Sequence, residues 1–325
     1  MHALITGGAG FIGSHLAESL LADGGAVTVI DDLSTGRLTN LADAQKHSSF
    51  QFVRGTVRDE SAVRPLVERA DVVYHLAAAV GVRRIVEAPV ETMETNIQGT
   101  GVILAAANRF RRPVFLASTS EVYGRNTAVP FREDADMIFG SVGYNRWSYA
   151  CSKVIDEFLG LAYHQETQLP VVVGRLFNVI GPRQTGAYGM VVPNFVRSAL
   201  RNEPLRIHGD GRQTRCFCHV RDIIQAIQPL PLNPRAAGEV FNIGATEEIS
   251  INALADAILE LTDSRSAKEY VSYEEAFGRP LEDMMRRRPD TAKLHALTGW
   301  SPQIPLRDAL RDVVEFMRAE MNESE

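Results

Sequence analysis

Short runs of apolar residues alternate with stretches of mixed polarity through the first half of the chain. The apolar runs are continuous, which is typical of strands that are buried on both faces of a parallel sheet. We predict strands over residues 2–6, 26–30, 50–53, 72–76, 113–117 and 170–176. Between them, apolar residues at helical spacing predict helices over residues 12–22 and 90–107. Strands that alternate with helices indicate an α/β fold with a doubly wound parallel sheet of the Rossmann type.

The second half of the chain shows fewer apolar runs and more turn residues. We expect a strand over 205–207 with a turn at 209–211, and a core strand over 238–244 that returns to the main sheet. Amphipathic helices are predicted over 251–261, with Ser250 as the N-cap, and over 306–321, with a frayed end at 322–325. The expected division is a larger domain of residues 1–177 and 217–246, and a smaller C-terminal lobe of 178–216 and 247–325.

Composition and charge narrow the class of protein. Of 325 residues, 45% are hydrophobic and 23% are charged, as in ordinary globular proteins. No apolar run is long enough to span a membrane, and the first residues show no secretory signal. A net charge of −6 provides no general attraction for nucleic acid or for an acidic membrane. We therefore expect no nucleic-acid partner and no membrane partner.

The three cysteines are too few for a disulfide framework, which favours reduced thiols and a cytoplasmic location. Cys216 and His219 could begin a metal site, but a second cluster of ligands is missing, so we expect no metal.

The first candidate site is a glycine-rich loop between the first strand and the first helix. Gly7, Gly10 and Gly13, with Phe11 and Ile12 between them, allow a tight turn and a close approach of a pyrophosphate to the helix N-terminus. The pattern predicts a dinucleotide cofactor.

A carboxylate at the end of the second strand selects the cofactor. Asp31 can bind the adenosine ribose hydroxyls and would repel a 2′-phosphate, so it favours NAD over NADP. The residues that follow it, Asp32, Ser34, Thr35 and Gly36, are expected beside that ribose. A structural glycine turn with an unrelated Asp is the alternative.

The second candidate site combines a phenol and an ammonium. Tyr149 and Lys153 are four residues apart, so on a helix they share one face. A nearby ammonium lowers the pKa of a phenol, which suits Tyr149 to proton transfer. Lysine occurs at only four positions in the chain, which strengthens the case for Lys153. A pair on the helix surface is the alternative, and the glycine loop argues against it.

Hydroxyl-bearing residues follow the strand predicted at 113–117. Thr119 and Ser120 can bind a substrate oxygen, and Glu121 is a candidate acid or base, since the carboxyl ends of parallel strands face the ligand crevice. An exposed hydroxyl-rich turn is the alternative.

Together these residues resemble the extended short-chain dehydrogenase/reductases that act on nucleotide sugars. The resemblance runs nearly from end to end and is carried by Tyr149 with Lys153 and by residues 6–13, 31–33, 75–78, 118–124, 175–178, 181–183 and 209–211. It implies an NAD-binding larger domain and a nucleotide-sugar-binding lobe. Further cofactor contacts are implied at Leu76, Ala77, Ala78 and Asn96, at Tyr149 and Lys153, and at Thr56 and Val57, where the family usually carries Asp-Ile.

The family includes several reactions, and Glu121 helps to separate them. Nucleotide-sugar 4-epimerases usually lack a Glu here, and dTDP-glucose 4,6-dehydratases carry Asp-Glu where this chain has Ser120-Glu121. GDP-mannose 4,6-dehydratases share Ser-Glu but normally prefer NADP. The chain is similar to UDP-glucuronate decarboxylases at Arg146, at Arg215, and at residues 282–290 and 299–302.

The resemblance implies NAD-dependent decarboxylation of UDP-glucuronate, through a 4-keto intermediate, to UDP-xylose or to the 4-keto pentose. The implied catalytic residues are Thr119, Ser120, Glu121, Tyr149, Lys153 and Arg215. Among these, Glu121 is expected opposite Arg215, and the two would assist the loss of carbon dioxide and the reprotonation of C5. The implied substrate-binding residues are Arg146, Asn178, Arg215 and Arg287. A 4-epimerase acting on UDP-glucuronate or UDP-glucose is the main alternative, and a 4,6-dehydratase or a non-catalytic NAD-binding regulator is less favoured. A homodimer is expected, through the helices after Val90 and after Ser148.

Overall fold

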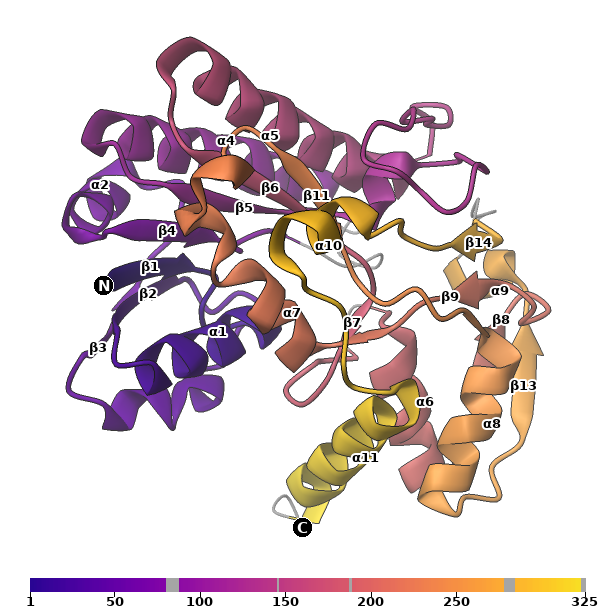
Figure 1. Ribbon diagram of the computed structural model, residues 1–325. Coiled ribbons are helices and arrows are strands. Elements are labelled where there is room, and N and C mark those ends of the chain that lie inside the picture. The colour runs from indigo at the N-terminus through magenta and orange to yellow at the C-terminus, as the bar shows by residue number, and fades with distance from the viewer. Residues whose placement is uncertain (80–87, 145, 187–188, 278–283, 323–325) are drawn as a thin grey trace.

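A seven-stranded parallel sheet forms the centre of the larger part of the protein (Figure 1). The computed structural model describes residues 1–79, 88–144, 146–186, 189–277 and 284–322. The strand order is β11-β6-β5-β4-β1-β2-β3, and every pairing in it is parallel. The strands are β1 (His2–Thr6), β2 (Ala26–Asp31), β3 (Phe50–Arg54), β4 (Val72–His75), β5 (Val114–Thr119), β6 (Val171–Leu176) and β11 (Val240–Ile243). The predicted doubly wound sheet is confirmed, including the late strand near residue 240.

Helices cover both faces of this sheet, as Figure 1 shows. Helices α1 (Phe11–Ala22) and α7 (Val220–Ile227) contribute to one hydrophobic core, and α2 (Glu60–Arg69), α4 (Pro89–Phe110) and α5 (Arg146–Thr167) contribute to the other. Successive strand residues point to opposite faces, so Ala3 and Ile5 belong to the first core and Leu4 to the second. This arrangement explains why the strand sequences are continuous apolar runs.

The order of strands reverses between β1 and β4, which are neighbours although β1 is followed in sequence by β2. At such a reversal the loops at the carboxyl ends separate and leave a crevice for a ligand. The loop after β4 stays tied to β1, because Leu76 donates its N–H to the Thr6 carbonyl at 3.2 Å.

The smaller C-terminal part packs around its own core beside the carboxyl ends of the sheet. That core draws residues from helices α6, α8 and α11. Its elements are β7 (Val179–Ile180), α6 (Val191–Leu200), β8 (Leu205–His208), β9 (Thr214–Arg215), β10 (Cys218–His219), β12 (Ile249–Ser250), α8 (Ile251–Thr262), β13 (Lys268–Val271), α9 (Tyr273–Phe277), β14 (Arg286–Arg287) and α11 (Leu306–Asn322). Helix α10 (Ala292–Thr298) lies between β14 and α11 in sequence but packs against β11 of the main sheet. Short 3-10 helices complete the fold: η1 (Leu38–Leu41), η2 (Ala44–Lys46), η3 (Ser120–Tyr123), η4 (Leu230–Leu232) and η5 (Pro234–Ala236). The expected domain boundaries stay a prediction.

Local sequence signals account for several element ends. Ser250 caps α8, as expected, by accepting a hydrogen bond from the Ala253 N–H at 3.1 Å. Asp59 caps α2 in the same way, through the N–H groups of Ser61 and Ala62. Within the described part of the chain, no helix is both long and apolar enough to cross a membrane.

A buried ion pair fastens α5 to the sheet. Arg175 of β6 donates to both carboxylate oxygens of Glu157, its Nη2 at 2.8 Å, and the two side chains are 3% and 4% exposed. The Ser118 hydroxyl of β5 donates to the same carboxylate. A charge buried to this degree depends on its partner.

We predict that Glu157→Gln lowers the free energy of unfolding by about 3 kcal/mol, because it leaves the Arg175 guanidinium buried without a counter-charge. Urea denaturation followed by circular dichroism measures the change. The exposed pair of Arg206 and Glu269, at 57% and 50% exposure, provides the control. Glu269→Gln should change stability by less than about 1 kcal/mol, and equal effects of the two substitutions would contradict the prediction.

Candidate active site

A pocket lies where the strand order reverses and extends along the carboxyl ends of β4, β1, β2 and β3. Its walls come from the loops after these strands and from α4. The lining residues are Gly7, Ile30, Asp31, Asp32, Ser34, Thr35, Gly55, Val57, Ala77, Ala78, Ala79 and Thr95. Eight of them were expected to contact a cofactor: Gly7, Asp31, Asp32, Ser34, Thr35, Val57, Ala77 and Ala78. The structure therefore gathers positions that are far apart in sequence around one pocket.

The glycine loop has no room for side chains where it touches the rest of the pocket. Gly7 has φ of +69°, and a Cβ on it would lie 2.8 Å from the backbone of Ala77. Gly36 is equally constrained, since its Cβ would lie 2.9 Å from the backbone of Ala9. Gly10 is less crowded: among the described residues, a Cβ on it would meet only the Gly7 carbonyl oxygen, at 3.1 Å.

The residues of this loop fit a dinucleotide. Helix α1 begins directly after Gly10, and no side chain caps its first N–H groups. Uncapped N–H groups at a helix N-terminus favour a pyrophosphate. Gly13 and the residues Phe11 and Ile12 lie in this first turn, outside the lining of the pocket described above.

Asp31 is held by the loops that it joins. It is 8% exposed, and its two oxygens accept the N–H groups of Ala9 at 2.9 Å and Leu33 at 2.8 Å. Burial raises the pKa of this carboxyl, and the two backbone hydrogen bonds counteract the rise. Asp31 thus lines the pocket and also orders both the glycine loop and the loop after β2.

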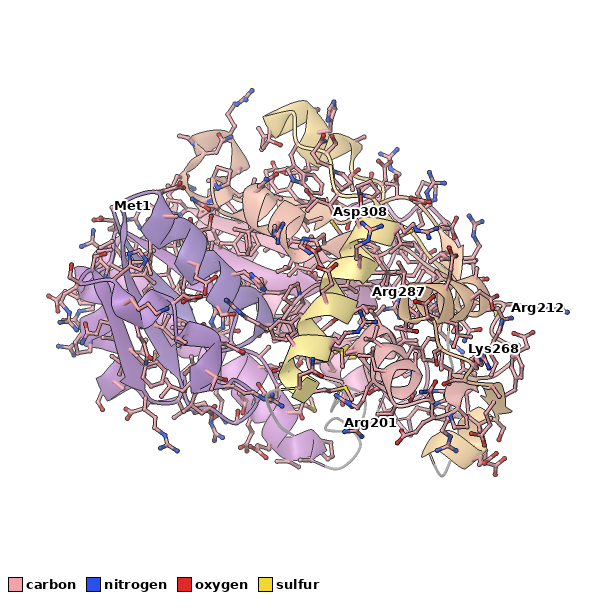
Figure 2. All side chains as sticks on the ribbon, turned by 90° about the horizontal axis from the view of Figure 1, so that it is seen from below. Met1, Arg201, Arg212, Lys268, Arg287 and Asp308 are labelled. Carbon is pink, nitrogen blue, oxygen red and sulfur yellow. The ribbon has the colours of Figure 1, made fainter. Side chains whose placement is uncertain are left out.

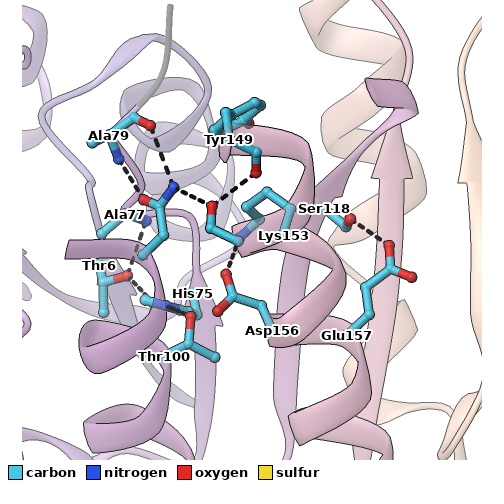
Figure 3. A network of polar contacts seen from close by, with 12 residues as sticks. Thr6, His75, Ala77, Ala79, Thr100, Ser118, Tyr149, Lys153, Asp156 and Glu157 are labelled. Atoms are coloured by element: carbon cyan, nitrogen blue, oxygen red, sulfur yellow. Dashed lines mark hydrogen bonds and ion pairs between the residues drawn. The ribbon is translucent and has the colours of Figure 1, made fainter. Parts of the chain in front are cut away.

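A chain of polar contacts runs behind the pocket (Figure 3). Thr6 accepts the N–H of Ala77 at 3.1 Å, and its hydroxyl lies 2.7 Å from Nδ1 of His75. The other ring nitrogen, Nε2, lies 3.1 Å from the Thr100 hydroxyl of α4. Burial, followed by the positive charge of Lys153, lowers the pKa of His75 to about 3. The imidazole is therefore neutral near pH 7.

Asn96 joins three elements rather than lining the pocket. Its Oδ1 accepts the N–H of Ala79 at 2.8 Å, and its Nδ2 donates to the Ser152 hydroxyl at 3.0 Å. Ser152 in turn donates to the Tyr149 carbonyl at 2.8 Å (Figure 3). This network positions the start of α5 against α4 and against the loop after β4.

Tyr149 and Lys153 both lie on α5, but Lys153 is paired with a different residue. Its Nζ donates to Oδ2 of Asp156 at 2.8 Å, and the two side chains are 3% and 0% exposed. The pKa of Tyr149 is raised, chiefly by burial and then by the negative charges of Glu121 and Asp156, while a hydrogen bond with Thr119 counteracts the rise. The expected lowering of the Tyr149 pKa is therefore wrong for this arrangement, and the role of Tyr149 in proton transfer stays a prediction.

The residues after β5 form the other half of the site. Thr119 ends the strand, and its hydroxyl accepts the N–H of Glu121 at 3.2 Å. Glu121 forms an ion pair of 2.7 Å with Arg287, whose Nη1 also lies 3.5 Å from the Ser120 hydroxyl. Arg287 is only 6% exposed, and Figure 2 shows it inside the outline of the molecule, whereas Arg212 reaches outward at its edge.

Two backbone connections bring Arg287 to this place. In the small sheet, β14 pairs with β9 in parallel, and Arg287 lies in register with Arg215. The segment after β14 is fixed to the larger part of the protein, because Phe131 donates to the Arg288 carbonyl and accepts the N–H of Asp290, both at 2.8 Å. Asn242 of β11 donates to the Phe131 carbonyl at 2.9 Å and strengthens this junction.

Glu121 pairs with Arg287, and its expected partnership with Arg215 stays a prediction. Nη1 of Arg215 donates to the carbonyls of Thr214 and Met284, each at 2.8 Å, and helps to hold the two strands. Asn178 uses its Nδ2 to donate to the Cys216 carbonyl at 2.8 Å. The side chain of Arg146 lies outside the described residues. No group of three or more potential metal ligands occurs among the side chains that the structure describes.

The remaining expected cofactor residues are not among those that line the pocket. They are Gly10, Phe11, Ile12, Gly13, Gly36, Thr56, Leu76, Asn96, Tyr149 and Lys153. The lining also contains Ile30, Gly55, Ala79 and Thr95, which sequence analysis missed. Thr95 directly precedes Asn96 on α4, so the prediction chose the correct helix but the wrong face of it. Thr95 lies four residues before Gly99, which packs against Val57, so the two share a face of α4. This helical spacing was the signal that could have identified Thr95.

Comparison with known proteins agrees with this geometry. The family model for GDP-mannose 4,6 dehydratase matches residues 4–313. A UDP-N-acetyl-alpha-D-glucosaminuronate decarboxylase from Bacillus cytotoxicus is 39% identical over 316 residues, covering 97% of each chain. UDP-glucuronic acid decarboxylase 1 from Danio rerio is 36% identical over 318 residues, covering 98% of this chain and 73% of that protein. The structure of UDP-glucuronic acid 4-epimerase from Bacillus cereus, in complex with UDP-glucuronic acid and NAD, has a TM-score of 0.88 at 30% identity and covers 98% of this chain and 100% of the other.

The match over nearly the whole chain shows that this protein belongs to the extended short-chain dehydrogenase/reductases that modify nucleotide sugars, a family of NAD-dependent decarboxylases, epimerases and dehydratases. The similar proteins include both decarboxylases and epimerases, so family membership leaves the reaction open.

We predict that Gly7→Ala weakens NADH binding by about tenfold or more, because a Cβ at positive φ would strain the backbone and displace the loop after β4. Fluorescence titration with NADH measures the affinity. Gly101→Ala on α4 is the control, since its Cβ would meet no described atom within 4 Å. Undiminished affinity in the Gly7 variant would show that this contact does not shape the cofactor pocket.

Proposed function

We propose that this protein is an NAD-dependent decarboxylase that converts UDP-glucuronate, through a 4-keto intermediate, to UDP-xylose or to the 4-keto pentose. The observation that carries the proposal is the ion pair of Glu121 with the buried Arg287, adjacent to Thr119 and Tyr149. A reaction confined to C4 of the sugar needs no such pair. Loss of carbon dioxide from C5 moves the negative charge of the carboxylate onto an enolate and then requires a proton at C5.

NAD is the cofactor that the pocket residues favour. Asp31 lines the pocket with a carboxylate that would repel the 2′-phosphate of NADP, and Gly10 leaves the N-terminus of α1 accessible to a pyrophosphate. When bound, NAD supplies the oxidant that accepts the hydride from C4 and can later return it.

In the first step, Tyr149 takes the proton of the C4 hydroxyl. The Thr119 hydroxyl, which bonds the phenol, orients the same oxygen together with Ser120. Because burial and two carboxylates disfavour the phenolate, Tyr149 must pass its proton on or receive stabilisation from Lys153 during the reaction. The product is a 4-keto uronate, which is a β-keto acid.

In the second step, the bond between C5 and the carboxylate carbon breaks. Its electron pair flows toward the C4 carbonyl to give an enolate, and carbon dioxide leaves as a neutral molecule. Glu121 directs a proton to C5, and Arg287 holds Glu121 and places positive charge beside the departing carboxylate. This assigns to Arg287 the assisting role that sequence analysis gave to Arg215, while Asn178, Arg215 and Arg146 remain candidates for substrate binding.

A 4-epimerase remains the second candidate, since the Bacillus cereus structure similar to this one is named a UDP-glucuronic acid 4-epimerase. An epimerase returns the hydride to the opposite face of C4 and retains the carboxylate. The mass of the product separates the two reactions. The acetylated uronate named for the Bacillus cytotoxicus relative is a second substrate to test.

The proposal includes a homodimer formed through α4 and α5. These two helices pack side by side and leave exposed apolar side chains at Val90 (69%), Ile155 (43%) and Phe158 (68%). Ile155 and Phe158 are three residues apart and share one face of α5. Apolar residues on one face of paired helices suit a second copy of the same surface.

We predict that Tyr149→Phe lowers kcat about a hundredfold or more, as expected for loss of a positioned acid/base, while NADH binding is retained. Tyr163→Phe, the same change further along α5, is the control and should keep normal turnover. Near-normal turnover of the Tyr149 variant would exclude the phenol as the proton acceptor.

We predict that wild-type protein releases carbon dioxide from UDP-glucuronate and that Glu121→Gln slows this release by about a hundredfold, with a much smaller change in KM, because it removes a group that acts in proton transfer. Mass spectrometry of the nucleotide sugar and a coupled assay for carbon dioxide measure the two quantities.

The matched control is Glu248→Gln. Glu248 forms an ion pair with Arg286, the neighbour of Arg287 in β14, and this pairing lowers the pKa of Glu248 to about 2. That variant should decarboxylate normally. If wild-type protein yields only UDP-galacturonate, the epimerase replaces the decarboxylase as the best description.

A further inference from the structure

Asp156 is a buried carboxylate that the proposed mechanism does not use. It lies on α5, one turn after Lys153, and its Oδ2 accepts the ammonium of Lys153 at 2.8 Å. Its side chain is 0% exposed, and its second oxygen, Oδ1, accepts no hydrogen bond from any residue that the structure describes. The pKa of Asp156 is raised by burial, while Lys153 and the Thr100 hydroxyl counteract the rise.

A burial this complete does not by itself stabilise the protein. The cost of removing both charges from water offsets much of their attraction, and apolar residues of similar volume often serve as well. The adjacent Glu157 already ties α5 to the sheet through Arg175. The placement of Asp156 is therefore better explained by what it does to Lys153 than by anchoring the helix.

The pair of Lys153 and Asp156 lies beside the polar chain behind the cofactor pocket (Figure 3). In that chain, Nε2 of His75 lies 3.1 Å from the Thr100 hydroxyl, and Nδ1 faces the Thr6 hydroxyl. Thr6 accepts the N–H of Ala77, which lines the pocket. The positive charge of Lys153 acts on this chain, because it helps to lower the pKa of His75.

We propose that Asp156 is a positioning residue that holds the Lys153 ammonium in a fixed place behind the cofactor pocket. The proposal rests on the proposed function for its consequences on catalysis, because there Lys153 acts with Tyr149.

The test is Asp156→Asn, which keeps the size of the side chain and removes its charge. Charged and titratable groups facing the Tyr149–Lys153 region are Glu121 after β5, His75 of β4, and Asp156 and Glu157 of α5. Asp156 raises the pKa of Tyr149, so its loss should move the acidic limb of the kcat profile to lower pH, by on the order of one pH unit. We expect kcat at the optimum to fall about tenfold with little change in KM, since the lysine is no longer held.

A second measurement does not need activity. The chain contains four lysines, at positions 46, 153, 268 and 293. With isotope-labelled lysine, NMR can therefore resolve the side-chain signal of each one. In Asp156→Asn the Lys153 signal should narrow and move toward that of free lysine, with the other three unchanged. Asp156→Glu, which keeps the charge, should restore the acidic limb.

Asp222→Asn is the matched control, because Asp222 is also a buried helix carboxylate with an oxygen that lacks a described partner. It should leave both the pH profile and the Lys153 signal unchanged. A folded Asp156→Asn protein with an unmoved acidic limb and an unchanged Lys153 signal overturns the proposal, whether or not its stability falls. If wild-type protein turns over no uridine uronate, the proposed function fails, and the Lys153 signal alone then supports or overturns the positioning role.

Discussion

Two buried carboxylates, adjacent on α5, set the geometry on which the rest of the site depends. Asp156 and Glu157 point to different partners, the first to Lys153 on the same helix and the second to Arg175 in the sheet. Because an unpaired charge in such surroundings is strongly unfavourable, neither partner has an alternative position at low cost. Glu157 fixes the helix, and with it Tyr149, against the sheet, whereas Asp156 fixes the position of the Lys153 ammonium on the helix.

The second half of the site has a different origin. Glu121 comes from the end of a sheet strand, and Arg287 comes from a two-residue strand near the other end of the chain. They meet because the segment after β14 forms backbone hydrogen bonds with Phe131 and lies in register with β9. The acid and its guanidinium partner therefore come together only when the C-terminal part is packed against the larger part of the protein.

The sequence was sufficient for the sheet, the glycine loop and most of the pocket, because each depends on local patterns: continuous apolar strands, glycines at a turn, and polar residues at strand ends. It was not sufficient where a contact depends on tertiary packing. No local pattern around Arg287 signals that the short strand β14 carries it to Glu121. The pKa of Tyr149 was misjudged because the i+4 spacing of Lys153 reveals neither the burial of the phenol, which raises its pKa most, nor the pairing of Lys153 with Asp156.

Asp31 shows how a ligand contact can be built into the scaffold. Its oxygens accept backbone N–H groups from both the glycine loop and the loop after β2, so the carboxylate closes those loops as well as facing the pocket. A change of cofactor preference by exchange of this single residue would leave two backbone donors without an acceptor. Redesign of the pocket for NADP must therefore also supply new acceptors for the N–H groups of Ala9 and Leu33. For the same reason, a single substitution at Asp31 would change the cofactor preference only at a cost to the two loops.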